Sequence, residues 1–174
     1  MLQSAFDLGE HLKLREVTFK VSPLLWQKWD ITELDLNFSN WNKIKFLNDT
    51  LDGFHPDIDS VPNDKGGLYL FYVSCQTISG ITEIPFYIGR AQITEGQNLR
   101  KRVREYFNKF CRNNERPKIT RMFNYWKQDL YLAYYELDDN LAIVDLEKKL
   151  INSLLLPMND EIPDLETRQA VKAF

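Results

Sequence analysis

The segment IVDLEKKLINSLL, residues 143–155, contains one charged residue whose position suggests chemistry. Successive residues of an α-helix lie about 100° apart, so the apolar residues from Ile143 to Leu154 share one face of the expected helix. Glu147 falls about 40° from Ile143, inside that face, whereas the neighbouring charged residues lie opposite. A carboxylate on a buried face needs a cationic partner or a metal ion. The helix therefore predicts a site built around Glu147.

A second expected helix, NLRKRVREYFNKFC, places a basic residue close to its buried face. Arg102 sits at the margin of an apolar stripe, next to Leu99 and Tyr106. One interpretation is a mutual ion pair between Arg102 and Glu147 that fixes the packing of the two helices. The other is a cleft in which the carboxylate holds a divalent cation and the guanidinium holds a phosphate. Periodicity alone leaves both open. The apolar stripe itself consists of Leu99, Val103, Tyr106, Phe107 and Phe110.

The charges of the chain are unevenly distributed, although the net charge of the 174 residues is only −3. Residues 1–65 hold 7 Lys and Arg against 11 Asp and Glu, a net of −4, and residues 135–174 hold 4 against 9, a net of −5. Residues 66–134 hold 11 against 5, a net of +6. Such a central basic segment indicates either a surface for a polyanion or a solvated helix face.

The elements that must position these residues begin at Gly67. GLYLFYV and PFYIG read as strands, joined by a hairpin that turns at Ser79–Gly80. LYLAYYEL is a third strand, and the last helix is expected to stop at Pro157. The order predicts an α+β fold with a small antiparallel three-stranded sheet flanked by helices, in a β-β-α-β-α core. We divide the chain into an N-terminal accessory region (1–65), which contains a further strand REVTFKV, a core domain (66–160) and a C-terminal tail (161–174).

Residues 66–160 resemble the GIY-YIG nuclease family. GLY at 67–69 and YIG at 87–89 are similar to its two signature tripeptides, and Arg102 matches its helical arginine. LEKKLI resembles the segment with the metal-binding glutamate, which falls on Glu147, and LLLPMND places Asn159 where the family has an asparagine. Two departures concern lengths: Tyr87 follows Tyr69 by 18 residues, and QITEGQ lengthens the loop after YIGR. The resemblance implies an endonuclease with one divalent ion, Mg²⁺ or Mn²⁺, at each site.

The chemistry implied by this resemblance assigns a role to each site residue. Glu147 holds a largely hydrated Mg²⁺ ion, and Arg102 holds the scissile phosphate. Tyr69 is the expected general base, although its ordinary pKa near 10 requires nearby positive charge from groups such as Arg90. The hydroxyl of Tyr87 positions water or a phosphate oxygen, and Asn159 orients neighbouring groups or the backbone at the site. Tyr69 and Tyr87 are also consistent with ordinary strand aromatics.

The expected partner is DNA, together with a second copy of the chain or another protein bound through the N-terminal region. Trp26, Trp29 and Trp41 fit packing against the core better than stacking on bases. The absence of a long apolar run and of a signal-peptide pattern predicts a cytoplasmic protein without a membrane partner. Basic residues of the central segment are candidates for contacts with the DNA backbone. They are Lys101, Arg104, Arg112, Arg116 and Arg121.

Three functions follow from these patterns. The first is a metal-dependent endonuclease, with a restriction-type or phage-defence enzyme fitting a chain of this length. The second is a nuclease fold that binds nucleic acid or acts as a scaffold without catalysis. The third is a nuclease subunit that acts inside a protein complex through the acidic N-terminal region.

Overall fold

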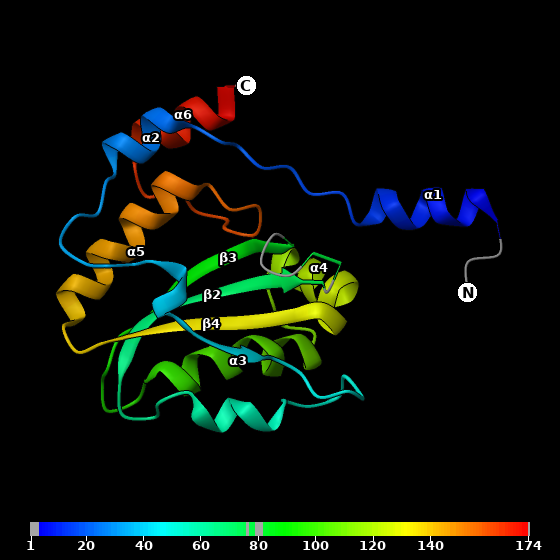
Figure 1. Cartoon of the computed structure of the whole chain (residues 1–174), viewed down its shortest axis with the longest axis horizontal. Helices are drawn as coiled ribbons and strands as arrows, with labels where there is room; N and C mark the ends of the chain where they lie inside the picture. The colour runs from blue at the N-terminus through cyan, green and yellow to red at the C-terminus, as the bar shows by residue number, and fades with distance from the viewer. Residues whose placement is uncertain (1–3, 76, 79–81, 174) are drawn as a thin grey trace.

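The computed structural model describes residues 4–75, 77–78 and 82–173 and shows an α+β fold (Figure 1). The hairpin turn predicted at Ser79–Gly80 lies outside these residues. The elements in chain order are α1 (Ala5–Leu14), α2 (Pro23–Lys28), η1 (Phe38–Asn40), β1 (Asn42–Lys45), η2 (Pro56–Ser60), β2 (Gly66–Ser74), β3 (Glu83–Ala91), α3 (Leu99–Cys111), α4 (Pro117–Trp126), η3 (Lys127–Asp129), β4 (Leu130–Leu137), α5 (Asn140–Leu154) and α6 (Leu165–Ala173).

The sheet contains four antiparallel strands in the order β1-β4-β2-β3, so the prediction of three strands was wrong. The additional strand, β1, pairs with β4 from Asn42 opposite Tyr134 to Lys45 opposite Tyr131. Its four residues are too short to give a clear alternation of apolar and polar side chains. Because β1 belongs to the sheet, the predicted boundary between residues 65 and 66 does not separate an accessory region from the core.

Helices cover both faces of the sheet, because the alternating side chains of the strands are apolar on both sides (Figure 1). Tyr69 and Phe71 of β2 belong to a core cluster with residues of α3 and α4. Leu68 and Leu70 point the other way, into a cluster with residues of α5. Trp41 is buried in this second cluster, as expected for a packing role, whereas Trp26 is exposed.

The two helices predicted around Arg102 and Glu147 are both present. α3 begins after Asn98, whose side chain accepts a hydrogen bond from the backbone N–H of Lys101 at 2.8 Å. α5 begins after Asp139 and ends at Leu155, which adopts the left-handed conformation with φ 46°. The sequence patterns therefore located both helices that carry candidate site residues.

α4 was not predicted, and it inserts a helix into the expected β-β-α-β-α order. Its first residue is Pro117, which fits the first helical position because no intrahelical N–H is required there. Ile119, Met122 and Phe123 form its buried face. Only these three residues are buried, and basic residues such as Lys118 and Arg121 lie among them, so the apolar period is short.

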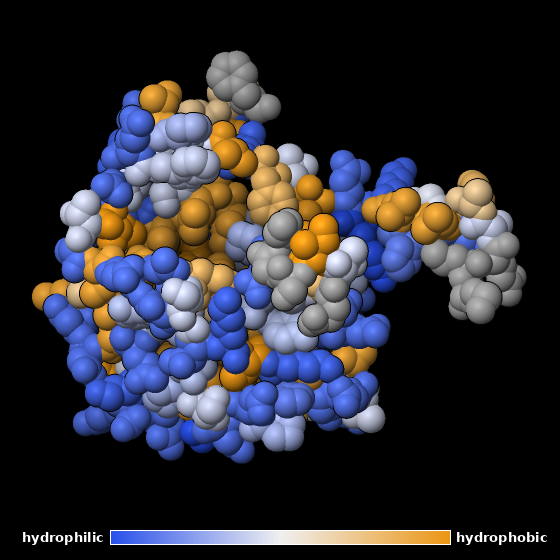
Figure 2. Space-filling model, in the orientation of Figure 1, coloured by the Kyte–Doolittle hydropathy of each residue, from blue (hydrophilic) through white to orange (hydrophobic). Residues whose placement is uncertain are grey.

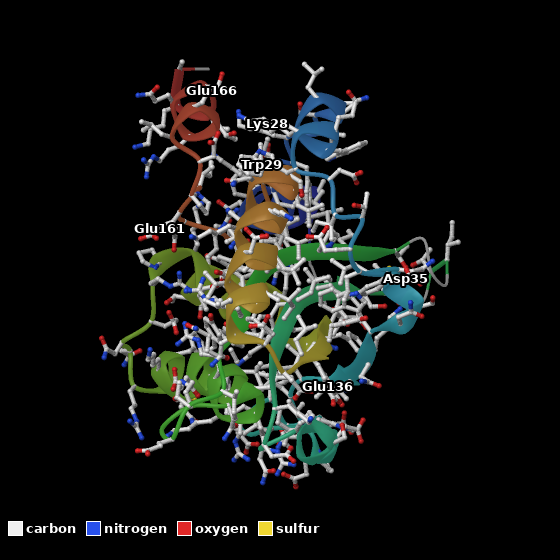
Figure 3. All side chains as sticks on the ribbon, turned by 90° about the vertical axis from the view of Figure 1, so that its left-hand side faces the viewer. Lys28, Trp29, Asp35, Glu136, Glu161 and Glu166 are labelled. Carbon is white, nitrogen blue, oxygen red and sulfur yellow. The ribbon has the colours of Figure 1, made fainter. Side chains whose placement is uncertain are left out.

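The terminal regions also differ from expectation. The predicted strand REVTFKV is irregular and pairs with no strand of the described sheet. The predicted tail contains α6, and Lys28 of α2 donates to Glu166 of α6 at 2.8 Å. Figure 3 shows these two labelled residues at the same end of the molecule. Among the described helices, none has the length and apolar character required to cross a membrane.

Candidate active site

A polar cleft of about 550 Å³ runs along the β3 edge of the sheet. Its walls come from β3, α3, the residue before α4, α5, the loop after α5 and α6. Tyr69 lies behind the cleft wall, fully buried, and does not line it. The cleft thus brings together five of the six predicted catalytic residues, which are Tyr87, Arg90, Arg102, Glu147 and Asn159.

A β-bulge orients Tyr87 toward the α3 side of the sheet. The register between β2 and β3 shifts at Phe71 and Tyr72, which pair with Tyr87 and Pro85, so Phe86 is the extra residue. Phe86 and Tyr87 consequently join the same core cluster instead of alternating across the sheet. This irregularity places the Tyr87 hydroxyl in reach of α3.

Three tyrosine hydroxyl groups form a chain from the core to the cleft. The hydroxyl of Tyr106 on α3 lies 2.7 Å from that of Tyr69 and 3.0 Å from that of Tyr87. Tyr106 is buried with Tyr69, whereas Tyr87 reaches the cleft. A hydroxyl both donates and accepts, so the three groups satisfy one another without solvent. Tyr106 is therefore the central member of the chain.

The environment of Tyr69 argues against its expected role as the general base. Burial raises the pKa of Tyr69 well above its ordinary value, and the lowering effect of Arg102 does not compensate. The residue is 0 % exposed, so its hydroxyl cannot contact a water molecule in the cleft. The structure therefore gives Tyr69 a place inside the hydroxyl chain rather than at the reacting atoms.

Gly89 makes room for the ring of Tyr69, its cross-strand partner. A Cβ atom at position 89 would lie 2.6 Å from the Tyr69 hydroxyl oxygen and 2.7 Å from the adjacent ring carbon. Gly67 is required for a different reason. Its φ of +152° disfavours other residues, and a Cβ there would lie 2.1 Å from the carbonyl oxygen of Tyr135.

Glu147 forms an ion pair with Arg90 across the cleft. The mutual ion pair between Arg102 and Glu147, one of the two interpretations left open by the sequence, is not formed, and the guanidinium of Arg102 donates to Glu105 at 2.8 Å. The Glu147 side chain is only 14 % exposed, and this burial raises its pKa despite the opposing effect of Arg90. The carboxylate thus faces inward, as the helical period predicted, but with a partner from β3.

Arg116 extends the positive wall of the cleft from the N-terminal side of α4. One guanidinium nitrogen donates to the Tyr87 hydroxyl at 3.4 Å, and another lies 3.5 Å from a carboxylate oxygen of Asp160. The guanidinium also lies over the Tyr87 and Tyr106 rings, 5.4 and 5.9 Å from their centroids. Of the five predicted DNA-backbone contacts, Arg116 alone lines the cleft.

The other four basic residues lie away from the cleft. Lys101 donates to the carbonyl of Gly96, and Arg104 lies over the Phe54 ring at 4.6 Å. Arg112 is exposed at the C-terminal end of α3. Arg121 donates to the carbonyl groups of Leu14 and Glu16, at 3.2 and 2.6 Å, so it anchors the N-terminal segment.

Asn159 fastens the loop after α5 to β3. Its side-chain amide donates to the Ile88 carbonyl at 2.9 Å and accepts from the Ile88 N–H at 3.1 Å. The preceding residue, Met158, donates its backbone N–H to Phe86 at 3.0 Å. Asn159 therefore contacts the backbone beside Tyr87 and holds the loop after α5 against β3.

Sequence reasoning missed several residues of the site. Tyr106 was assigned to the apolar stripe of α3, and its position four residues after Arg102 is the signal that places both on one face. The guanidinium of Arg102 lies 5.3 Å from the centroid of the Tyr106 ring. Further cationic and acidic residues of the cleft come from elements that no local pattern connects. They are Lys148, Asp160, Glu161 and Arg168.

The donor set can hold one hydrated divalent cation. Within the described residues no group of three His, Cys, Asp or Glu side chains converges, so a metal cage made of protein ligands is absent there. Mg²⁺ commonly binds through one or two carboxylates while it keeps several waters. Glu147 supplies one such carboxylate, provided that the contact with Arg90 is exchanged. The residues therefore fit a single hydrated ion better than a closed metal site.

Comparisons with models of protein families, with curated proteins and with solved structures find no match to this chain.

Proposed function

We propose that this protein is a divalent-metal-dependent endonuclease that hydrolyses phosphodiester bonds in DNA. The observation that carries the proposal is the convergence, in one cleft, of a tyrosine hydroxyl, an inward-facing carboxylate and several guanidinium groups. Phosphodiester hydrolysis requires a held phosphate, a positioned water and stabilisation of developing negative charge. The cleft supplies a residue type suited to each requirement.

The cationic groups favour a polyanionic substrate. Arg90, Arg102, Arg116, Lys148 and Arg168 line the cleft. A guanidinium can donate two parallel hydrogen bonds to a phosphate, and in a partly buried cleft such bonds are stronger than on an open surface. The cleft carries more cationic than acidic side chains, whereas the whole chain has a net charge of −3. This local excess is the electrostatic support for nucleic acid as the substrate.

Arg102 and Arg116 hold the scissile phosphate from two sides, because they reach the cleft from α3 and from the start of α4. The Tyr87 hydroxyl, which accepts a hydrogen bond from Arg116 at 3.4 Å, orients the attacking water or a non-bridging phosphate oxygen. Tyr106 and Tyr69 are positioning residues, since neither lines the cleft and each acts on it through other side chains: Tyr106 bonds to the Tyr87 hydroxyl and to that of Tyr69, and Arg102 lies over the Tyr106 ring. Fixing the hydroxyl before substrate arrives reduces the reorganisation needed during the reaction.

Glu147 is the residue that holds the cation in this proposal. A bound divalent ion supplies a charge that stabilises the phosphate oxygens and favours ionisation of water. Substrate binding assists the binding of the cation to Glu147. A phosphate group gives Arg90 another anionic partner, so the Glu147 carboxylate becomes free for the ion. Arg90 is therefore proposed to alternate between Glu147 and the substrate.

The test is cleavage of supercoiled plasmid DNA in the presence of Mg²⁺. We expect Glu147→Gln and Tyr87→Phe to reduce the rate by about 100-fold or more, as is typical when an electrostatic or hydrogen-bonding group is removed from a reacting centre. The matched control is Tyr131→Phe, because Tyr131 lies on β4 outside the cleft and its hydroxyl has no hydrogen bond in the described chain. Equal rates for all four proteins would refute the proposal.

A second function, nucleic-acid binding without hydrolysis, is favoured by one observation. The Arg90–Glu147 ion pair neutralises the carboxylate that a metal ion needs. A calorimetric titration with Mn²⁺ in the presence of a short DNA duplex separates the two functions. Heat of metal binding that disappears in Glu147→Gln supports the nuclease, whereas unchanged DNA binding without any metal response supports the binding module.

The biological setting is part of the same proposal. Cys75 and Cys111 are both free and exposed, which is compatible with the reducing cytoplasm. The setting we propose is restriction or defence against phages.

A further inference from the structure

A second cavity, of about 620 Å³, adjoins the polar cleft beside α6. We call it the α6 pocket, because Arg168, Val171 and Lys172 of that helix line it. Six residues line both cavities, so a molecule bound in the cleft can extend into the α6 pocket along the loop between α5 and α6. In Figure 3 the labelled Glu161 marks this loop. The six shared residues are Ile151, Asn159, Asp160, Glu161, Ile162 and Arg168.

The α6 pocket combines an apolar base with a cationic mouth. Ile151 and Leu156 are buried and lie at its base, whereas Lys20 and Lys172 are exposed and lie at its mouth. Four cationic residues line the pocket against two acidic ones. The apolar residues are Ile151, Leu155, Leu156, Pro157, Ile162 and Val171, the cationic ones are Lys20, Lys118, Arg168 and Lys172, and the acidic ones are Asp160 and Glu161.

Three of these four cationic groups are available to an anion. The ammonium group of Lys118 lies 3.8 Å from a carboxylate oxygen of Asp160. Lys20, Arg168 and Lys172, by contrast, form no ion pair with any residue that the structure describes. The pocket therefore offers uncompensated positive charge beside apolar surface.

Helix α6 presents one face to the pocket. Val171 and Lys172 follow Arg168 by three and four residues, so the three side chains share a face of the helix. The start of α6 is fastened to α5, because the Asp164 N–H donates to the side chain of Asn152 at 3.1 Å. This contact fixes the wall of the pocket that α6 forms.

Lys20 reaches the pocket from the N-terminal segment. Helix α1 stands apart from the rest of the molecule in Figure 2, so the position of the segment depends on contacts after that helix. Arg121 of α4 donates to the Glu16 carbonyl at 2.6 Å, and Val17 packs against the core cluster. These contacts anchor the chain three residues before Lys20.

We propose that the α6 pocket binds an unpaired nucleotide of the DNA strand whose scissile phosphate lies in the cleft. This inference rests on the proposed function. The apolar residues suit the faces of a base, and the cationic groups at the mouth suit a phosphate. Turning a base out of a duplex costs pairing and stacking free energy, and this cost is smallest for a base that is already unpaired. The substrate class is therefore DNA with an unpaired nucleotide near the position of cleavage.

Fluorescence anisotropy without a divalent ion tests the proposal, because it measures binding in the absence of hydrolysis. The probes are three labelled duplexes of one sequence: fully paired, with one unpaired adenine, and with an abasic residue in place of that adenine. We expect the natural chain to bind the unpaired-adenine duplex about tenfold more tightly than the abasic duplex, a ratio typical of contacts to one base. Equal affinities for these two duplexes would overturn the proposal, and the comparison requires no variant.

Val171→Glu tests whether the base lies in the α6 pocket. The added carboxylate lies against the base and should reduce the ratio of the two affinities to about one. The matched control is Leu165→Glu, the same change in charge at a position of α6 that is 57 % exposed and outside the pocket. It should keep the tenfold ratio, because a general effect of the added charge cancels between the two duplexes. A ratio that survives Val171→Glu would overturn the assignment.

Lys20→Gln/Lys172→Gln tests the phosphate contacts. This variant should bind all three duplexes more weakly, and the slope of log affinity against log salt should decrease by about two, or about one for each lysine. The matched control is Lys13→Gln/Lys127→Gln, which removes two charges outside both cavities and should keep the natural slope. A natural slope in Lys20→Gln/Lys172→Gln would overturn the phosphate contacts.

Plasmid cleavage separates failure of this inference from failure of the proposed function. A natural chain that cleaves plasmid with Mg²⁺ but binds the unpaired-adenine and abasic duplexes equally overturns the inference and leaves the nuclease standing. A chain that discriminates between these duplexes but cleaves no plasmid supports the nucleotide pocket and refutes the nuclease. A chain that binds none of the three duplexes refutes both.

Discussion

Gly89→Ala is the substitution whose effect the structure determines most directly. The added methyl carbon would lie 2.6 Å from the Tyr69 hydroxyl oxygen and 2.7 Å from the ring carbon that carries it. Ordinary contacts between carbon atoms are about 3.5–4.0 Å, so the ring must retreat by about 1 Å. Tyr69 has no free space for this movement, because it is fully buried between two strands and α3.

The cost of Gly89→Ala has two parts. Inserting a methyl group into a packed core typically costs about 1–3 kcal/mol. Displacing Tyr69 also breaks its 2.7 Å hydrogen bond to Tyr106, which contributes about 1 kcal/mol. We therefore expect the free energy of unfolding to fall by about 2–4 kcal/mol, which lowers the urea midpoint by about 1–2 M for a typical dependence on denaturant.

Urea denaturation followed by tryptophan fluorescence measures this change. The matched control is Gly96→Ala, because a Cβ atom at position 96 meets no atom within 4 Å. The free energy of unfolding of Gly96→Ala should differ from that of the natural chain by less than about 0.5 kcal/mol. The double variant Gly89→Ala/Tyr69→Phe lacks the Tyr69 hydroxyl oxygen, which is the atom nearest to the added methyl group. The double variant should therefore lose less free energy of unfolding than the sum of the losses in the two single variants. Equal midpoints for Gly89→Ala and Gly96→Ala would refute the packing described for Tyr69.

Three further predictions concern the cleft. Arg90→Gln leaves the Glu147 carboxylate without its ion-pair partner and should destabilise the fold by about 2 kcal/mol, which is less than for a fully buried pair because Arg90 is partly exposed. Lys45→Gln breaks a solvent-exposed pair and should destabilise the fold less than Arg90→Gln does; calorimetry compares the two variants. Burial raises the pKa of Glu147 above its ordinary value of 4.5, so the contribution of this group to the free energy of unfolding is present below pH 4.5 and is lost as the pH rises through the raised pKa. Glu147→Gln removes this group and should therefore make the dependence of stability on pH flatter just above pH 4.5. An unchanged slope would contradict the burial of Glu147. Asn159→Ala removes two hydrogen bonds to Ile88 and should cost about 1–3 kcal/mol, with faster hydrogen exchange of the Ile88 amide; unchanged exchange would show that the loop does not protect β3.

Periodicity predicted the parts of the fold that are long enough to show it. α3 and α5 were located correctly, and the inward position of Glu147 followed from the 3.6-residue period. β1 was not predicted because four residues cannot establish an alternating pattern. α4 was not predicted because only three of its residues are buried, which is too few for a clear helical period among its basic residues. The REVTFKV segment shows the opposite error, since strand-forming residues do not make a strand without a neighbour to pair with.

Pairings within the site were harder to predict than its members. Glu147 was identified from its own helix, but its partner Arg90 lies 57 residues earlier on β3. The role of Tyr106 was hidden because a tyrosine in an apolar stripe looks like any core aromatic. Arg121 was expected to contact DNA because of its charge alone, whereas in the structure its guanidinium donates hydrogen bonds to two backbone carbonyl groups. Such contacts depend on tertiary structure that one sequence does not encode in any local pattern.

The loop fastened by Met158 and Asn159 also protects the protein from self-templated aggregation. β3 ends the sheet on one side, and an uncovered outer strand offers its N–H and carbonyl groups to the strand of any other molecule. The loop occupies these groups at Phe86 and Ile88. The opposite border needs no such cover, since β1 is only four residues long and carries two lysines. The edge of β3 is thus covered by the Met158 N–H and the Asn159 side chain, whereas the edge of β1 is short and charged.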